Sequence, residues 1–228
     1  MKYIKHIKNL LKYFVKQPHC QSTFYSHYGE DMILHYIFQK QTTGFYVDVG
    51  SYHPEFFSNT KKLYDKGWSG INIDANLLSV ELFNVARTND YNFNLAITNK
   101  NKNKNKIKFF YRRKMNVLNT TNEKFAKINF PNGYKIVNVK CSSLNKVLNK
   151  TKYKGRIIDF LNLDVESTEK DVLESLNFSI YKPKLICIEI HFNKLKDLKF
   201  NKIYKFLLKK NYILMWRKKY SFIFSIKS

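Results

Sequence analysis

Apolar residues follow two different spacings along this chain. Residues 3 to 15 place Ile4, Ile7, Leu11 and Phe14 at helical spacing with lysines on the opposite face, which predicts a basic amphipathic helix. After Gly44 the pattern changes to short continuous apolar runs that end at polar residues, which predicts buried strands. We therefore expect an N-terminal helix and lead-in over residues 1–27 and one domain over residues 28–228.

These apolar runs alternate with helical patterns. Expected strands cover residues 45–49, 71–74, 91–95, 107–111, 157–163, 185–190, 212–216 and 220–226. Expected helices cover residues 29–40, 58–66, 77–87, 143–148 and 200–209, with another after Thr168, and we expect Ser58 and Thr168 to act as N-caps. Only three residues separate the last two strands, so they should form an antiparallel hairpin. The order predicts an α/β fold: a mostly parallel sheet of about seven strands with helices on both faces and a C-terminal antiparallel hairpin, typical of a class I methyltransferase Rossmann-like sheet.

The charge of the chain is strongly positive. It has 41 Lys and Arg against 17 Asp and Glu, a formal net charge of +24. Such a surplus can serve nucleic acid, an anionic membrane face or an acidic substrate. However, 36 of the 41 cations are Lys and the chain has 25 Asn, which is typical of an AT-rich genome acting on any surface. Both origins of the charge stay open.

Location and redox state follow from what the sequence lacks. No apolar run approaches the 18 residues of a membrane span, and lysines interrupt the first twenty residues where a signal peptide needs an apolar core. Cys20, Cys141 and Cys187 lie far apart, which predicts neither a zinc cluster nor a disulfide framework. We expect a cytoplasmic protein whose N-terminal helix could contact the inner face of a membrane. The oligomeric state is not predicted.

Polar residues stand at the ends of the expected strands, where ligands collect in open α/β sheets. These residues are Asp48, Gly50, Ser51, Asp74, Asn94, Asp164, Glu166, Glu189 and His191. Gly50 permits close approach of the backbone to a ligand, and Asp74 stands 24 residues later, where an acid bonds ribose hydroxyls in nucleotide-binding sheets. Neither a G-x-G-x-x-G nor a G-x-x-x-x-G-K-[ST] phosphate loop is present. An acid-rich pocket without a phosphate loop favours S-adenosylmethionine, which carries a ribose and a cationic sulfonium, over NAD or ATP.

Several motifs together resemble a known family. They are S-x-Y-G-E-D at Ser26–Asp31, G-F-Y-V-D-V-G-S-Y-H-P at Gly44–Pro54, S-N-T at Ser58–Thr60, G-W-x-G-I-N-I-D-A-N at Gly67–Asn76, N-L-A-I at Asn94–Ile97, F-L-N-L-D-V-E at Phe160–Glu166 and I-C-I-E-I-H at Ile186–His191. In this order, over residues 26 to 192, they resemble the FkbM family of S-adenosylmethionine-dependent methyltransferases. One departure is Ser167, where the family usually has Gly after D-V-E.

The resemblance implies positions for the cofactor. Asp48, Gly50 and Ser51 correspond to the loop around the methionine part, with Asp74 and Ala75 at the ribose. Asn94 and Ala96 correspond to the adenine wall. Glu30, His53 and Asn59 fall in motif blocks that flank the cofactor. The resemblance also implies O-methylation, frequently of a sugar hydroxyl in a polysaccharide or of a related small molecule.

Methyl transfer from a sulfonium needs alignment more than acid chemistry, but a hydroxyl acceptor must lose its proton. We assign Asp164, Glu166 and His191, on neighbouring strand ends, as the catalytic residues that supply this base and orient the acceptor. The same residues with Glu189 could bind Mg²⁺ or Mn²⁺, although cofactor and lysines could equally engage them, so no metal ligand is assigned.

Two other functions stay open. The charge and the aromatic residues suit a 2′-O-methyltransferase of RNA or cap, but such enzymes usually arrange Lys-Asp-Lys-Glu with the Glu on a late strand, and residues 198–228 contain no acid. A non-catalytic module that binds polyanions or membranes on the same fold is the third hypothesis.

Overall fold

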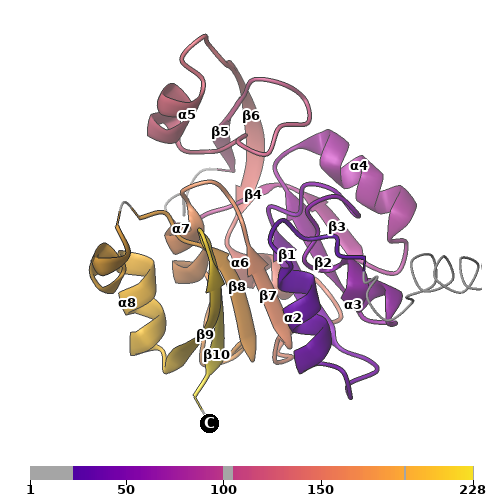
Figure 1. Cartoon of the computed structure of the whole chain (residues 1–228). Coiled ribbons are helices and arrows are strands. Elements are labelled where there is room, and N and C mark those ends of the chain that lie inside the picture. The colour runs from indigo at the N-terminus through magenta and orange to yellow at the C-terminus, as the bar shows by residue number, and fades with distance from the viewer. Residues whose placement is uncertain (1–22, 100–104, 193, 228) are drawn as a thin grey trace, which may run out of the picture.

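The computed structural model describes residues 23–99, 105–192 and 194–227 (Figure 1). The amphipathic helix predicted before residue 16 lies outside the described residues. Within them, no helix combines the length and the hydropathy needed to cross a membrane.

The described chain is built on one large mixed sheet (Figure 1). Its parallel strands, in spatial order, are β3 (Tyr91–Asn94), β2 (Ser69–Asp74), β1 (Phe45–Val49), β7 (Phe160–Leu163) and β8 (Leu185–Glu189). Next come β10 (Ser221–Ile226) and β9 (Tyr212–Lys218), which are antiparallel. This seven-stranded order, with its C-terminal hairpin, confirms the predicted Rossmann-like methyltransferase sheet.

Helices cover both faces of this sheet. They are α2 (Glu30–Ile37), α3 (Lys61–Asp65), α4 (Leu77–Ala86), α6 (Leu144–Leu148), α7 (Glu169–Glu174), the 3₁₀ helix η1 (Leu195–Phe200) and α8 (Lys202–Lys209). The remaining described helix, α5 (Glu123–Asn129), packs against a smaller sheet instead. Leu34 of α2 and Leu63 of α3 pack in one buried cluster with Tyr46, whereas Val172 of α7 and Leu207 of α8 pack in another with Val47. Successive side chains of a strand point to opposite faces, so β1 has a core on each side, which explains its unbroken apolar run.

Two of the predicted N-caps are wrong. α3 begins after Thr60, and Ser58 Oγ instead accepts a hydrogen bond of 2.9 Å from the guanidinium of Arg87. Thr168 occupies the N-cap position of α7, but its hydroxyl donates to the carbonyl of Val165 rather than accepting from the helix. In both places the hydroxyl group forms a hydrogen bond with a group outside the helix.

A smaller sheet lies beyond the carboxyl ends of the large one. It consists of β4 (Ala96–Ile97), β6 (Lys135–Ser142) and β5 (Lys106–Tyr111), with β6 between the other two strands. Only β5 was predicted. Ile136 and Val137 of β6 are exposed side by side, so this strand lacks the alternation by which a half-buried strand is recognised. With α5, this smaller sheet forms the upper part of Figure 1.

Candidate active site

The site lies where the strand order of the large sheet reverses. β1 continues along the chain towards β2 on one side, while β7 follows β1 in space on the other. The two strands are in register, with Asp48 opposite Asn162 and Val49 opposite Leu163. Their carboxyl ends therefore meet at the switch point, where open α/β sheets bind ligands.

Two connected cavities open at these strand ends. The smaller one, here the Asp74 cavity, is lined by Asp74, Ala75, Leu95, Ala96, Phe109 and Asn116, among others. The larger one, the His191 cavity, has a volume of about 440 Å³ and is lined by Glu30, Asp48, Ser51, Asn59, Glu189 and His191, among others. Both are lined by Gly50, Tyr52, Val117, Asp164 and Glu166, so they form one groove.

Gly50 lies at the junction of the two cavities. The structure gives a different reason from the predicted one for a glycine at this position. Its φ is +80°, and a Cβ there would lie 1.7 Å from the carbonyl oxygen of Asp164. The close approach predicted for this residue is therefore to the backbone of the neighbouring strand end. The amide of Asp164 also donates to the carbonyl of Val49 at 3.0 Å. Only glycine lets the loops after β1 and β7 come this close.

Asp74 ends β2 and is held by backbone amides. Its Oδ2 accepts from the amide of Tyr52 at 2.8 Å and its Oδ1 from the amide of Asn76 at 2.7 Å. Burial raises the pKa of Asp74 above its usual value, against these hydrogen bonds. Asn94 does not line the Asp74 cavity; its amide donates to the carbonyls of Asp74 and Ala75, both at 3.1 Å. Asn94 thus positions the Asp74 loop.

Asp48 is fully buried in β1 and faces the His191 cavity. Its oxygens accept from Thr60 Oγ1 and from Asn162 Nδ2, each at 2.8 Å, and burial raises its pKa. Asn162 in turn accepts from Asn59 Nδ2 at 2.8 Å, which leaves Asn59 Oδ1 buried without a hydrogen-bond partner. Ser51 Oγ is also buried and unpartnered. These two oxygens are free to accept or donate bonds to a ligand.

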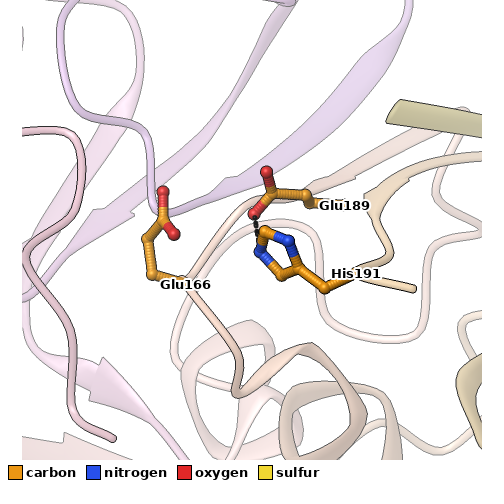
Figure 2. Close-up of side chains that lie close together, drawn as sticks. All are labelled: Glu166, Glu189 and His191. Atoms are coloured by element: carbon orange, nitrogen blue, oxygen red, sulfur yellow. Dashed lines mark ion pairs between the residues drawn. The ribbon is translucent and has the colours of Figure 1, made fainter. Parts of the chain in front are cut away.

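Carboxylates gather on the opposite wall of the His191 cavity. Asp164 is exposed to the cavities it lines but is otherwise surrounded by protein, and this burial, with the charges of Glu189 and Glu166, raises its pKa well above the usual range. Burial and the neighbouring Glu189 and Glu169 carboxylates raise the pKa of Glu166 to about 8. His191 Nε2 lies 3.0 Å from Glu189 Oε2, and this contact raises the pKa of His191 (Figure 2).

The turn that carries Glu166 is strained. Glu166 has a φ of +54° and Ser167 a φ of +77°, and residues other than glycine rarely adopt such positive φ values. Ser167, which stands where the family usually has Gly, therefore adopts a backbone conformation that glycine would adopt more easily. A buried hydroxyl, that of Thr120, donates to the carbonyl of Glu166 at 2.7 Å. Glu169 Oε1 accepts from the amides of Val165 and Ser167, and burial raises the pKa of Glu169 to about 7.

His53 is a predicted cofactor residue that the structure places outside both cavities. Its Nδ1 accepts from the amides of Glu55 and Phe56. Burial lowers its pKa. Its role in binding cofactor stays a prediction, and the local contacts describe a residue that shapes the turn after Tyr52.

Arg87 is a positioning residue that the sequence reasoning missed. It is 1% exposed and its guanidinium donates to Thr60 Oγ1 at 2.7 Å, Ser58 Oγ at 2.9 Å and the carbonyl of Pro54 at 2.6 Å. It therefore holds the loop that brings Ser51 and Asn59 to the cavity. The sequence does contain a signal for this role. Arg is rare compared with Lys in this chain, and its planar guanidinium can donate several hydrogen bonds at once.

The charge of the groove is opposite to that of the whole chain. Among the described residues that line the two cavities there is no Lys and no Arg. The acids lining them are Glu30, Asp48, Asp74, Asp164, Glu166 and Glu189. The groove is suited to a ligand that brings positive charge.

The comparisons with known proteins agree with this geometry. The family model described as the methyltransferase FkbM domain matches residues 48–214, which contain most of the large sheet and all residues at the junction of the cavities. No curated protein and no solved structure matches the chain.

Proposed function

Because the chain belongs to the FkbM methyltransferase family, we propose that it transfers a methyl group to a hydroxyl oxygen of a sugar, a polysaccharide or a related small molecule. The family makes the chain an S-adenosylmethionine-dependent methyltransferase, which argues against a purely binding module. The acceptor and its hydroxyl group are the parts that we propose.

The residues of the groove fit S-adenosylmethionine. Asp74 and Ala75 with Ala96 would hold the ribose and adenine in the Asp74 cavity. Ser51 and Asn59, whose oxygens are buried without partners, would meet the amino acid end. The absence of Lys and Arg from the cavity walls suits a sulfonium and an ammonium. When bound, S-adenosylmethionine supplies a methyl group activated by the positive sulfur.

The chain itself holds the acceptor and removes its proton. Glu166 and Asp164 line both cavities, so they lie where the two substrates must meet. The raised pKa of Glu166, about 8, is suited to a base that takes a hydroxyl proton near neutral pH. His191, paired with Glu189, lies on the acceptor side and orients the acceptor by hydrogen bonding.

The observation that best supports a hydroxyl acceptor is the set of residues that line the His191 cavity. Its described lining includes five carboxylates, from Glu30, Asp48, Asp164, Glu166 and Glu189, and no Lys or Arg to receive a phosphate. Carboxylates accept hydrogen bonds from hydroxyl groups and repel anions. An RNA or cap acceptor, whose phosphates flank the methylated ribose, finds no Lys or Arg in this described lining, so the net charge of +24 gives that alternative no support inside the groove.

Two further expectations stay predictions. The amphipathic segment at residues 3–15 lies outside the described residues, so contact with a membrane through it rests on the sequence alone. A cytoplasmic location is likewise proposed.

A thermal shift with each ligand tests the cofactor. S-adenosylmethionine and S-adenosylhomocysteine should raise the melting temperature, because a ligand that binds only the folded state stabilises it by RT ln(1 + [L]/Kd). ATP and NAD should not. The acceptor is tested by transfer of labelled methyl groups to two pools, neutral glycans and RNA. Label on glycans supports the proposal, and label confined to RNA contradicts it.

A further inference from the structure

The His191 cavity contains more carboxyl groups than the cofactor can pair with. Bound S-adenosylmethionine carries a sulfonium, an ammonium and a carboxylate, which sum to one positive charge. Among the described residues, the cavity lining contains five carboxyl groups and no Lys or Arg. Buried carboxylates are costly unless they are protonated, paired with cations or bound to a metal. A second cation is therefore expected in this cavity.

Three side chains at the ends of β7 and β8 are arranged to receive it. Glu166, Glu189 and His191 each offer one ligand atom, and these atoms all lie within 4.8 Å of one another. Figure 2 shows the Glu166 carboxylate beside the His191–Glu189 pair. Glu166 is 8% exposed and its Oε2 is buried without a hydrogen-bond partner. A buried carboxyl oxygen without a donor has room for a proton, a water molecule or a cation.

The separation of His191 and Glu189 has the size of an octahedral edge. Two ligands that bind one ion at about 2.1 Å and at a right angle lie about 3.0 Å apart. His191 Nε2 and Glu189 Oε2 are 3.0 Å apart. The pair would therefore need little movement to bind an ion at adjacent positions, with Glu166 as a third ligand.

We propose that Glu166, Glu189 and His191 bind one divalent cation of the Mg²⁺ and Mn²⁺ class. Carboxylate oxygens suit both ions, and the imidazole favours Mn²⁺ over Mg²⁺. Three protein ligands leave octahedral positions for water and for oxygens of the acceptor.

The role of this metal site in catalysis rests on the proposed function, because the ion would bind oxygens of the proposed hydroxyl acceptor. In the metal-bound protein Glu166 is a ligand of the ion and no longer the base, and Asp164, the other carboxylate at the junction of the cavities, takes the hydroxyl proton instead. The acceptor oxygen then forms a bond to the methyl carbon while the carbon–sulfur bond breaks. The sulfur keeps the electron pair and leaves as the neutral thioether of S-adenosylhomocysteine.

Direct metal binding tests the site without any turnover. The full chain is freed of metal with a chelator, dialysed and titrated with MnCl₂, and free Mn²⁺ is counted by electron paramagnetic resonance. One Mn²⁺ should bind per chain. Glu166→Gln, Glu189→Gln and His191→Ala should each weaken binding about 100-fold or more, since even outer-shell changes cost 10- to 100-fold. Glu174→Gln, which removes an exposed acid of α7, should bind as the wild type does.

Two outcomes separate this inference from the proposed function. Binding of S-adenosylmethionine is measured by calorimetry on the chelated protein, and melting curves of each variant confirm folding. If the cofactor binds but Mn²⁺ does not bind at millimolar concentration, or binds equally to all variants, the metal site is wrong and the proposed function stands. If Mn²⁺ binds as expected but the cofactor does not bind with or without it, the proposed function is wrong.

Discussion

The two cavities of the groove meet at Gly50 but differ in how the carboxylates that line them are hydrogen-bonded. In the Asp74 cavity, both oxygens of Asp74 accept backbone amides, so the acid is held in place before any ligand binds. In the His191 cavity, Asp48 is also hydrogen-bonded through both oxygens, but the acids at the ends of β7 and β8 lie close to one another, and Glu166 retains an oxygen without a partner. The first arrangement is typical of a binding pocket. The second keeps acids unsatisfied, at a cost in stability, where chemistry requires them.

Gly50→Ala should disrupt both cavities at once and have the largest effect. A Cβ would lie 1.7 Å from the Asp164 carbonyl, so the two strand ends must separate. We expect a loss of stability of more than about 4 kcal/mol, in urea unfolding, together with loss of cofactor binding.

Gly133→Ala is the matched control for this variant. Gly133 also has a positive φ, of +98°, but nothing lies within 4 Å of its Cβ position. It should cost only about 1 kcal/mol. Equal destabilisation of the two variants would show that the contact with Asp164 has no importance.

Glu166→Gln should lower turnover and leave cofactor binding nearly unchanged. Gln keeps the size of the side chain but can neither take a proton nor carry the charge, so we expect kcat to fall 10²- to 10⁴-fold. The affinity for S-adenosylmethionine, measured by calorimetry, should stay within about twofold of the wild type. His191→Ala should behave in the same way, and Glu174→Gln should retain full activity. Unchanged turnover in both cavity variants would remove them from the catalytic assignment.

The unsatisfied acids should also make stability depend on pH. Burial raises the pKa of Glu169 from its usual 4.5 to about 7, so the folded state binds more protons than the unfolded state between these values. The free energy of unfolding should therefore fall as the pH rises from about 4 to 8, by about 3 kcal/mol for this group. The raised pKa of Glu166, about 8, extends the fall to higher pH.

Urea unfolding at several pH values, without cofactor or metal, measures this dependence. Glu169→Gln keeps an oxygen for the Val165 and Ser167 amides but does not titrate, so its profile should be flatter. If wild type and variant give parallel profiles, Glu169 is not protonated in the folded protein.

Asp74→Asn should have the smallest effect, and this effect should be limited to cofactor binding. Asn can accept one of the two backbone bonds but has lost the charge, which we expect to weaken S-adenosylmethionine about 10-fold. The value of kcat at saturating cofactor should be nearly unchanged. Asp65→Asn, the same change at an exposed acid of α3, is the control. A kcat loss as large as that of Glu166→Gln would remove the contrast between the cavities.

The sequence predicted the large sheet well because local patterns determine it. Runs such as Phe45–Val49 and Leu185–Glu189 are buried on both faces, so an unbroken apolar stretch marks each strand. The smaller sheet was largely missed. β6 is mostly exposed and pairs with β5 across the intervening α5, a contact that no local spacing reports.

The sequence pointed to acids that the structure brings to the groove, but it did not give their geometry, and their roles stay predictions. Acids at strand ends identified Asp48, Asp74 and Asp164 because parallel strands bring their ends together. The contacts that position them come from distant parts of the chain. Thr120 reaches Glu166, and Arg87 spans the loop before α3. The sequence contains these residues, but only the tertiary structure shows their partners.

The contrast between a negative groove and a chain of net charge +24 has a kinetic consequence. A cationic donor approaching from bulk water first meets the repulsive field of the exterior and is attracted only near the entrance. Salt screens the long-range repulsion over about 8–10 Å but reaches charges inside the groove less. Association of S-adenosylmethionine should therefore become faster as ionic strength rises, the reverse of the usual behaviour for an acidic pocket that captures a cation.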